Sequence, residues 1–303
     1  MRINTLSCYV PEMMLYLTNV QNQYKTVYGK EIFEKDLNGE SLEYKIKQTV
    51  LAKVAQIKVL NLMAADYQIT LSQSEEEKIQ KAASEYIESL NIIEEELLNP
   101  QLSDVERIYE EYEIANKVYE YIVRDVNPEI SDDEARNVTF QHILIKTYTL
   151  DGNKNRIEYT DKAKKEAQKT AEDVQARAEL GEEDFESLAT EYNEDSQMTY
   201  TVARGEMNPL VEEAAFNLDE GEVSKVIETE FGYHILKCVS TFDVEQTQEN
   251  KKRILQERKD AVFKETYDNY LPKLQKNLNE PLWDSIELIM DPAVTTDDLF
   301  TEF

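Results

Sequence analysis

Glycine, proline and cysteine are all scarce in this chain. Seven glycines and seven prolines in 303 residues leave few tight turns, which favours long helices. No apolar run approaches the ~20 residues that span a bilayer, so a transmembrane helix is not expected. The two cysteines, Cys8 and Cys238, have neither metal-ligand nor redox spacing, and nothing in the sequence favours a disulfide between them.

Basic residues are also in short supply. Lys and Arg total 33 against 62 Asp and Glu, which gives a formal net charge of −29. A field of this sign repels nucleic acid and anionic lipid, so the composition predicts no nucleic-acid partner. The simplest interpretation of the charge is a solvated acidic surface. A sharper interpretation is attraction of basic unfolded chains, which the charge alone does not establish.

Helical periodicity fills most of the first 126 residues. The clearest pattern begins at 103–106, where Ser, Asp, Val and Glu form a capping box, and the helix that follows is predicted to reach Val126. This helix covers only about three heptads, so packing on neighbouring helices explains it better than a coiled-coil dimer does. Earlier helices are predicted to start at Pro11, at Ser41, and at Ser72 or Ser74.

The character of the chain changes after the Asn127-Pro128 pair. Residues 138–146 are predicted to form a strand, because apolar residues run there without a helix breaker. A lysine-rich helix is predicted over about 159–180, where Gly181 ends it. Helical periodicity returns after Asp243. The predicted segments are a helical part over 1–137, an α/β module over 138–241, and a C-terminal helix and tail over 242–303 that packs on the first part.

Both histidines of the chain open similar apolar runs, at 141–145 and 233–237. Each run is typical of a β-strand, in which side chains alternate between the two faces. His142 and His234 are therefore each expected to share a face with the leucine two positions later. Two imidazoles placed in this way can meet at the centre of one sheet. No third ligand has suitable spacing, so neither a metal nor a cofactor is predicted.

Further short motifs surround these runs, among them Asn193-Glu194-Asp195-Ser196 and Arg204-Gly205-Glu206-Met207. With them, residues 138–241 resemble a parvulin-type peptidyl-prolyl isomerase domain. The whole chain resembles the PrsA-type foldases and, more distantly, the SurA-type chaperones. The resemblance implies an α+β fold, with a parvulin-like domain of a small antiparallel sheet and surrounding helices inserted in an all-α chaperone-like module. The matching runs are 141–145, 181–189, 192–196, 204–207, 213–218, 221–224 and 230–236.

The resemblance carries functional roles to particular residues. The paired core histidines of the family fall on His142 and His234. The acidic position beside the substrate falls on Asp195, and a hydroxyl next to the histidines falls on Thr229. Isomerisation of an X-Pro bond disrupts amide resonance but requires no bond to carbon to be made. Such a site therefore needs an apolar pocket for the proline ring and a suitable electrostatic field, but no base. The residues implied for substrate binding are Met207, Val211, Val202, Thr199 and Phe216.

Two departures from the family pattern bear on activity. The segment 197–203 is shorter than the usual stretch before Arg204 and has no glycine, and Val211 stands where the family has a pocket phenylalanine. Valine offers less contact area to a proline ring. Two functions therefore stay open: a prolyl isomerase that assists the folding of exported proteins, and a non-catalytic holdase that keeps a degenerate parvulin domain as a scaffold. In either protein the two histidines could brace the sheet.

Location and partners are also expectations from the resemblance. It implies an extracytoplasmic foldase at the outer face of the cell membrane, secreted or lipid-anchored. Residues 1–4, however, are not followed by the apolar run of a signal peptide. The protein is then either cytoplasmic or numbered from a mature or recombinant start. Unfolded polypeptides and X-Pro segments are the expected partners, and a homodimer through the helical part is left open.

Overall fold

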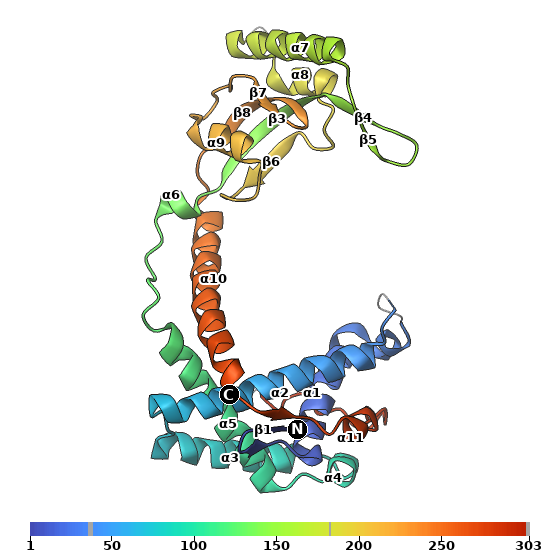
Figure 1. The fold of residues 1–303 in the computed structure, drawn as a ribbon, viewed down its shortest axis with the longest axis vertical. Coiled ribbons are helices and arrows are strands. Elements are labelled where there is room, and N and C mark those ends of the chain that lie inside the picture. The colour runs from blue at the N-terminus through green and yellow to red at the C-terminus, as the bar shows by residue number, and fades with distance from the viewer. Residues whose placement is uncertain (36–38, 182, 301–303) are drawn as a thin grey trace. The chain divides into compact units, whose positions relative to one another are not determined.

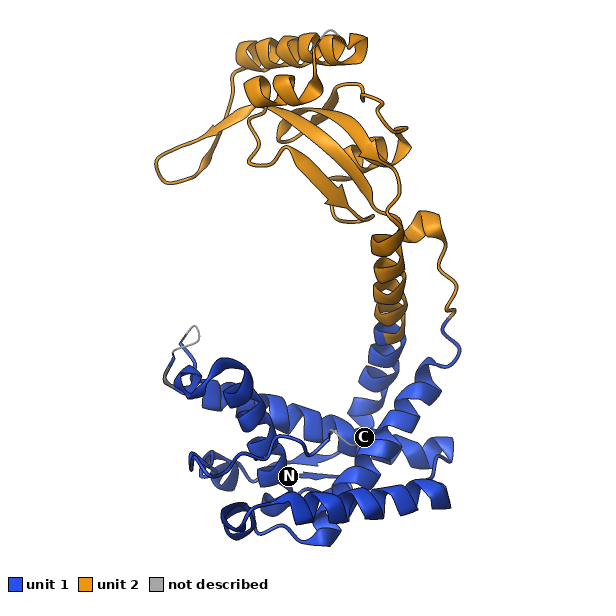
Figure 2. Ribbon diagram, turned by 180° about the vertical axis from the view of Figure 1, so that it is seen from behind, with its two compact units in different colours: residues 1–126, 260–303 blue, residues 127–259 orange. Residues whose placement is uncertain are grey.

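A computed structural model describes residues 1–35, 39–181 and 183–300, and Glu182, within the matched run 181–189, lies outside them. The chain forms two compact units (Figure 2). Residues 1–126 and 260–303 make up the first, called here the helical unit. Residues 127–259 make up the second, called the sheet unit.

The sheet unit extends beyond the predicted limits 138–241 at both ends. The Asn250 side chain donates a hydrogen bond to the Ala135 carbonyl over 2.8 Å. Arg258 Nη2 lies 2.6 Å from Glu134 Oε1. These contacts attach the segment before the first long strand to the helix that follows the last one. Single polar contacts of this kind leave no periodic pattern, so the sequence did not indicate the wider boundaries.

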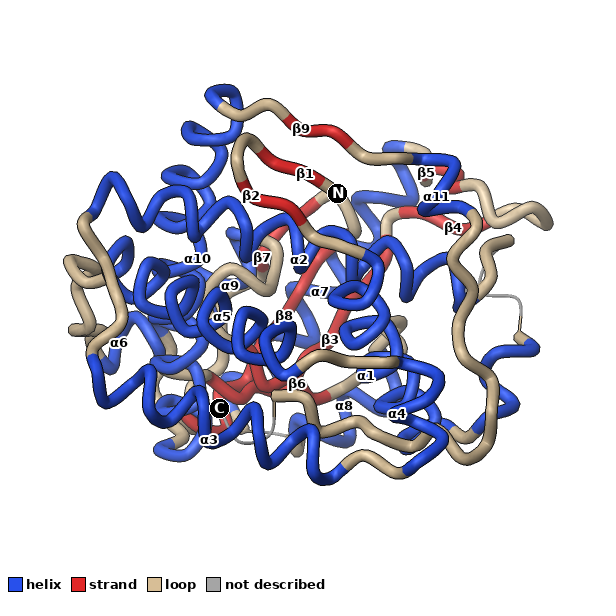
Figure 3. Tube along the Cα trace, turned by 90° about the horizontal axis from the view of Figure 1, so that it is seen from below, coloured by secondary structure: helices blue, strands red, loops and turns tan. Residues whose placement is uncertain are grey.

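Amphipathic helices make up most of the helical unit, together with a small sheet of order β2-β1-β9 (Figures 1 and 3). The sheet was not predicted, because strands of two residues are too short to show alternation. The elements are β1 (Arg2–Ile3), β2 (Leu6–Ser7), α1 (Val10–Tyr28), η1 (Lys30–Glu34), α2 (Leu42–Tyr67), α3 (Gln73–Ser89), α4 (Ile92–Leu98), α5 (Leu102–Val123), η2 (Leu271–Lys273), β9 (Lys276–Asn277) and α11 (Glu280–Asp284), with α10 (Val244–Tyr270) beginning in the sheet unit.

Helix starts follow the groups that cap them. Ser72 and Glu75 form a complete capping box at the start of α3. The capping box predicted at 103–106 is wrong, because α5 begins at Leu102 and has no side-chain cap. The carbonyl of Gln101 already accepts backbone hydrogen bonds from inside the helix, which places residue 103 within the first turn.

The core of the helical unit is shared between the two ends of the chain. Ile57 of α2 and Ile108 of α5 belong to the same apolar cluster as Trp283 and Leu299. Trp283 is 6% exposed and Leu299 is 0% exposed. Phe263, Tyr267 and Tyr270 of α10 pack against this cluster. Leu271, Leu274 and Leu278 also pack against it, although the helix ends before them, at Tyr270.

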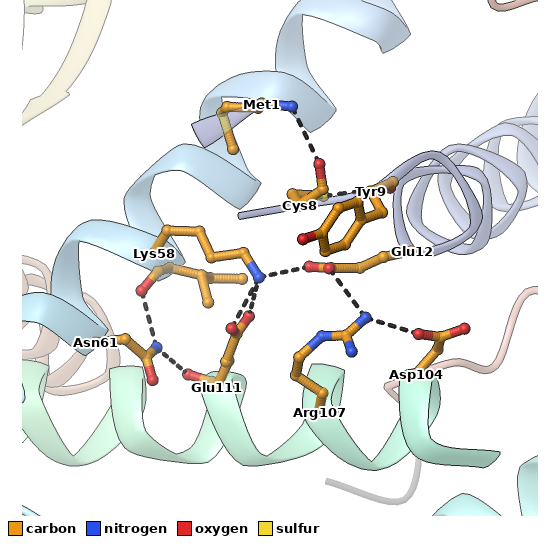
Figure 4. A network of polar contacts seen from close by, with 10 residues as sticks. Met1, Cys8, Tyr9, Glu12, Lys58, Asn61, Asp104, Arg107 and Glu111 are labelled. Atoms are coloured by element: carbon orange, nitrogen blue, oxygen red, sulfur yellow. Dashed lines mark hydrogen bonds and ion pairs between the residues drawn. The ribbon is translucent and has the colours of Figure 1, made fainter. Parts of the chain in front are cut away.

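A buried ion network crosses this core (Figure 4). Lys58 Nζ lies 2.8 Å from Glu12 Oε1, and 2.8 and 2.5 Å from the two carboxylate oxygens of Glu111. Arg107 Nη2 lies 3.4 Å from Glu12 Oε2. Burial lowers the pKa of Lys58, but the two carboxylates outweigh burial and hold that pKa above its usual value. The charged ammonium therefore joins α1, α2 and α5 through their buried faces.

The sheet unit contains an antiparallel sheet of order β6-β3-β8-β7 (Figure 1). A separate hairpin of β4 and β5, which was not predicted, follows β3. The elements are α6 (Asp132–Ala135), β3 (Val138–Lys146), β4 (Tyr148–Leu150), β5 (Arg156–Glu158), α7 (Asp161–Leu180), α8 (Phe185–Tyr192), β6 (Thr199–Val202), α9 (Pro209–Asn217), β7 (Ile227–Thr229) and β8 (Gly232–Ser240).

The two faces of this sheet have separate cores. Ile143 packs with residues of α7 and α8, and Phe140 packs with residues of α9. The register pairs His142 with Leu236, and the residue at 234 with the one at 144. Because side chains alternate along each strand, both histidines lie on the α9 face, with the leucines two positions away. The predicted sharing of faces is confirmed.

Candidate active site

The two histidines meet across β3 and β8. His142 Nε2 lies 2.9 Å from His234 Nδ1, which is hydrogen-bonding distance. The rings are 5.1 Å apart between centroids and inclined by 15°. His142 is 2% exposed and His234 is 6% exposed. The hydrogen bond therefore lies inside the sheet unit, where a polar group without a partner would be unfavourable.

A further side chain holds each end of the histidine pair. Thr229 Oγ1 lies 2.6 Å from His234 Nε2, and Phe231 N donates to the same hydroxyl oxygen over 3.1 Å. At the other end Asp195 Oδ2 lies 3.3 Å from His142 Nδ1, a longer and less well aligned contact. The structure brings all four residues that the resemblance assigns to catalysis into one line.

Asp195 is held ionised by other donors. Tyr200 OH donates to Asp195 Oδ2 over 2.7 Å, and Ser196 N donates to Oδ1 over 2.7 Å. Burial raises the pKa of Asp195, but the Tyr200 and Ser196 hydrogen bonds and nearby positive charge outweigh it and keep the pKa below its ordinary value. Burial, and then the carboxylate, raise the pKa of Tyr200. At neutral pH a phenol therefore donates to a carboxylate.

The ionised carboxylate fixes the protons along the line. A carboxylate only accepts, so His142 carries its proton on Nδ1 and accepts at Nε2. His234 then has to donate from Nδ1, and its Nε2 accepts from the Thr229 hydroxyl. The Phe231 N–H already occupies one lone pair of that hydroxyl oxygen, which leaves its hydrogen free to donate. This pattern, assigned from the network of partners, makes both imidazoles neutral Nδ1–H forms.

Burial also keeps the two imidazoles uncharged. It lowers the pKa of His142, and the nearby Asp195 opposes it only in part. It lowers the pKa of His234 to about 4, with His142 adding to the effect. Near neutral pH neither ring is a cation, so the pair presents fixed dipoles and no proton donor of the imidazolium kind.

Comparisons with known proteins show what the chain is similar to. The family model of the rotamase, PPIC-type PPIase domain matches residues 142–240. The foldase protein PrsA of Caldanaerobacter subterraneus subsp. tengcongensis is 29% identical over 262 residues, 82% of this chain and 76% of the relative. PrsA of Clostridium acetobutylicum is 25% identical over 285 residues, 84% and 81% of the two chains. A match to a crystal structure of PrsA from Bacillus cereus covers 86% of this chain and 90% of that chain, at 19% identity and a TM-score of 0.38.

The sheet unit contains a parvulin-type rotamase domain. The chain as a whole is PrsA-like, since the similarity to PrsA foldases extends over most of both sequences. The residues from Thr229 to Asp195 described above all lie within the stretch that this family model matches.

The apolar residues implied for substrate binding form one cluster of the parvulin domain. Met207, Val211, Val202 and Phe216 pack together on the α9 face of the sheet. Val211 is 1% exposed, and Val202 and Phe216 are each 5% exposed. Met207 is half-buried. The three buried side chains therefore support the site from below, and Met207 is the member of the four that a ligand could touch.

Thr199 lies apart from this cluster. It is exposed and precedes Tyr200 along β6, so it lies on the opposite face of the sheet from the histidines. Tyr200 takes the place expected for Thr199: its ring stacks on Phe140 at 5.8 Å and meets His142 edge-on at 5.6 Å. The sequence reasoning missed Tyr200, although its spacing of two from Val202 places both on one face of a strand.

The described part of the chain was also compared with the requirements of a metal site, a membrane-spanning helix and a disulfide. Within residues 1–35, 39–181 and 183–300, no group of three or more His, Cys, Asp or Glu is arranged to hold a metal ion. Across the same residues, none of the helices combines the length and the apolar character needed to cross a membrane. Cys8 and Cys238 are both buried free thiols.

Proposed function

We propose that this protein is an extracytoplasmic foldase that binds unfolded polypeptide and isomerises X-Pro bonds at its parvulin domain. The observation that carries the proposal is the continuous line from Thr229 through His234 and His142 to Asp195. Relatives named foldase protein PrsA support the wider role in protein folding. In this proposal the helical unit holds the client, and the parvulin domain acts on its prolines.

Isomerisation needs an apolar binding surface that excludes water and a preorganised electrostatic field. Rotation about an X-Pro bond crosses a barrier of about 18–20 kcal/mol, because the twisted amide loses its resonance. Met207 would contact the pyrrolidine ring. The neutral histidine pair and the ionised Asp195 would provide preorganised dipoles and charge beside the twisted amide, and so favour it over both planar forms. No covalent bond to the protein and no proton transfer are needed.

A second function, holding clients without catalysis, is favoured by Tyr200. Its hydroxyl donates a hydrogen bond to Asp195 Oδ2, and its ring lies edge-on to His142. The phenol therefore covers the groups that a substrate would approach. Val211 lies where an aromatic residue would give the proline ring more contact. In such a protein the histidine line would brace the sheet, and the helical unit would carry the activity.

A protease-coupled assay on Ala-X-Pro peptides tests catalysis. We expect the full chain to accelerate isomerisation, and Met207→Ala to lower kcat/KM by about tenfold, since a side chain in contact with the ring is worth on the order of 1.4 kcal/mol. Thr199→Ala is the matched control, because Thr199 lies on the opposite face, and it should leave the rate unchanged. Equal losses from both variants would contradict the proposed site.

Aggregation of a denatured client separates the two functions. A chain that suppresses aggregation but leaves the isomerisation rate at its uncatalysed value is a holdase, and the catalytic part of the proposal is then wrong. A chain that does neither is not a foldase at all. Circular dichroism of each variant shows whether a lost activity reflects a lost fold.

A further inference from the structure

The last described stretch of the helical unit, residues 285–300, packs on the helices as an irregular segment with turns at 292–293 and 299–300. From 286 onward it forms neither helix nor strand. It is nevertheless well buried at intervals: Leu288, Val294 and Leu299 are 8%, 2% and 0% exposed. The stretch, called here the tail, therefore packs along the helical unit, and the surface of α1, α4 and α5 that it covers is called here the tail groove.

Buried side chains hold the tail by its main chain. Gln21 Nε2 donates to the Ile289 carbonyl over 2.6 Å, and Asn22 Nδ2 donates to the Thr296 carbonyl over 2.8 Å. The amide of Leu299 donates to Asn19 Oδ1 over 2.9 Å. Asn19, Gln21 and Asn22 are 3%, 0% and 1% exposed. Contacts to main-chain groups do not depend on side-chain identity, so the groove can hold other extended sequences.

Glu94 of α4 holds the next part of the tail in the same way. Its Oε1 accepts from Thr295 N over 2.6 Å and from Thr296 N over 2.8 Å. At the end of the tail, the Phe300 ring lies 5.4 Å from that of Tyr16 and 4.8 Å from that of Tyr112. The groove thus combines main-chain contacts with aromatic contacts, which is how peptide-binding grooves obtain affinity and preference.

The tail does not satisfy every polar group of its groove. In the described part of the chain, Gln21 Oε1 and Asn22 Oδ1 are buried acceptors without a hydrogen-bond partner. Both belong to side chains whose amide nitrogens already hold the tail. A buried acceptor without a partner is unfavourable, so a ligand that brings N–H donors to these two oxygens would gain over the tail.

The charge of the tail also differs from that of a segment that would bind the groove more tightly. Its acidic residues are Glu287, Asp291, Asp297 and Asp298, and it has no lysine or arginine. The whole chain carries a formal net charge of −29. The field of the whole chain repels an acidic segment and attracts a basic one of equal length, while Lys25 beside Asp291 and Lys53 over the Phe300 ring oppose this locally.

We propose that the tail groove is a peptide-binding site occupied in cis by the chain's own tail, and that an extended segment of an unfolded client, apolar at intervals and basic between, displaces the tail. This inference rests on the proposed function, because it names the place where the foldase holds its client. The tail then acts as a competing ligand. The apparent affinity for the client is the intrinsic affinity multiplied by the fraction of time in which the tail has left the groove.

Hydrogen exchange on the full chain tests the displacement. The probe is a synthetic peptide that copies residues 285–300 with its four acidic residues replaced by lysine. At saturating peptide, the tail amides of Thr295, Thr296 and Leu299 should exchange at least about tenfold faster, while those of α2 stay protected. Peptide that binds without changing tail exchange, or that shows no saturable binding, would overturn the inference.

Two matched substitutions test the competition. Leu299→Ser removes a buried anchor of the tail and should tighten binding of the lysine peptide by about tenfold. Leu282→Ser makes the same change at a residue that is 46% exposed and lies before the tail, and it should change nothing. Equal effects would overturn the inference, as would dimerisation of the Leu299→Ser chain by tail exchange. If the Leu299→Ser chain loses its helical circular dichroism signal, the hydrogen-exchange experiment on the unmodified chain alone tests the inference.

A permanently unfolded basic protein separates this inference from the proposed function. Reduced and alkylated lysozyme should compete with the lysine peptide and release the same tail amides. If the peptide displaces the tail but lysozyme does not bind, the foldase proposal fails and the groove stands. If lysozyme binds and the tail stays protected, the foldase stands and the tail groove is not its client site.

Discussion

Replacing Asp195 by asparagine is expected to reverse the protonation of both histidines. An amide has one accepting and one donating end, whereas a carboxylate accepts at both. Ser196 N donates to Asp195 Oδ1 over 2.7 Å, so the amide oxygen has to take that position. The NH2 group then faces Tyr200 OH and His142 Nδ1, and that ring nitrogen has to accept.

The reversal passes along the whole line. With Nδ1 accepting, His142 carries its proton on Nε2 and donates to His234 Nδ1, so the proton of His234 also moves to Nε2, facing Thr229. The opposite orientation of the amide would set two N–H donors 2.7 Å apart in place of a hydrogen bond. Leaving such a group unsatisfied costs about 1–3 kcal/mol, which favours the reversed pattern by a factor of about 5–150.

Nitrogen NMR of the imidazole rings measures this directly. The chain has only two histidines, so four ring nitrogens report the whole pattern. We expect protons on Nδ1 in both rings of the native chain, and on Nε2 in both rings of Asp195→Asn. Glu194→Gln is the matched control, since Glu194 bonds to Lys146 N over 2.5 Å and should leave the native pattern intact. Nδ1–H forms in Asp195→Asn, or Nε2–H forms in the native chain, would refute the reasoning.

The remaining predictions are changes in stability at buried positions, where the expected effects are large. The pKa of His234 is lowered to about 4 by burial, so between pH 6.5 and 4 the unfolded chain takes up a proton that the native ring does not. The parvulin domain should therefore lose about 3 kcal/mol of stability as the pH falls through that window, measured by amide exchange in β3 and β8. Lys58→Met leaves two buried carboxylates without their shared cation and should lower the free energy of unfolding by about 3–5 kcal/mol, measured by the fluorescence of Trp283, the single tryptophan of the chain. Gly232→Ala would set Cβ 2.1 Å from Ile145 O at a φ of +136°, and should destabilise the sheet by more than about 2 kcal/mol in thermal melts.

Each of these three predictions has its own control. Constant stability of the parvulin domain from pH 6.5 to 4 would contradict the neutral histidine pair. Lys81→Met breaks an exposed pair with Glu85 and should change stability by less than about 0.5 kcal/mol, so an equal loss there would contradict the role of burial at Lys58. Gly152→Ala meets nothing within 4 Å and should be tolerated where Gly232→Ala is not.

The parts of the fold that the sequence predicted share a long, regular pattern. The strand at 138–146 has the bounds that its apolar run indicated. The alternation of side chains correctly placed each histidine on the same face as the leucine two positions later, because a buried sheet tolerates only one register. Helix α2 follows its cap at Ser41 for the same reason, since its apolar stripe has to face the core.

The features that escaped prediction depend on a single contact or a very short element. Tyr200 lies on a strand of only four residues, which is too short for its alternation with Thr199 and Thr201 to stand out. The first turn of α5 was misplaced because Ser103 resembles a cap while the carbonyl of Gln101 begins the helix. The docking of the tail rests on side-chain contacts to main chain, as at Asn19, and such contacts have no sequence signature.

The shared core of the helical unit also sets an order of events while the chain is being made. Residues 127–259 are complete before Trp283 and Leu299 exist, so the parvulin domain can fold as it emerges. The core of the first 126 residues is completed later, when Trp283 and Leu299 join its apolar cluster. During that interval a newly made copy of this protein exposes the same kind of surface as the clients it is proposed to hold.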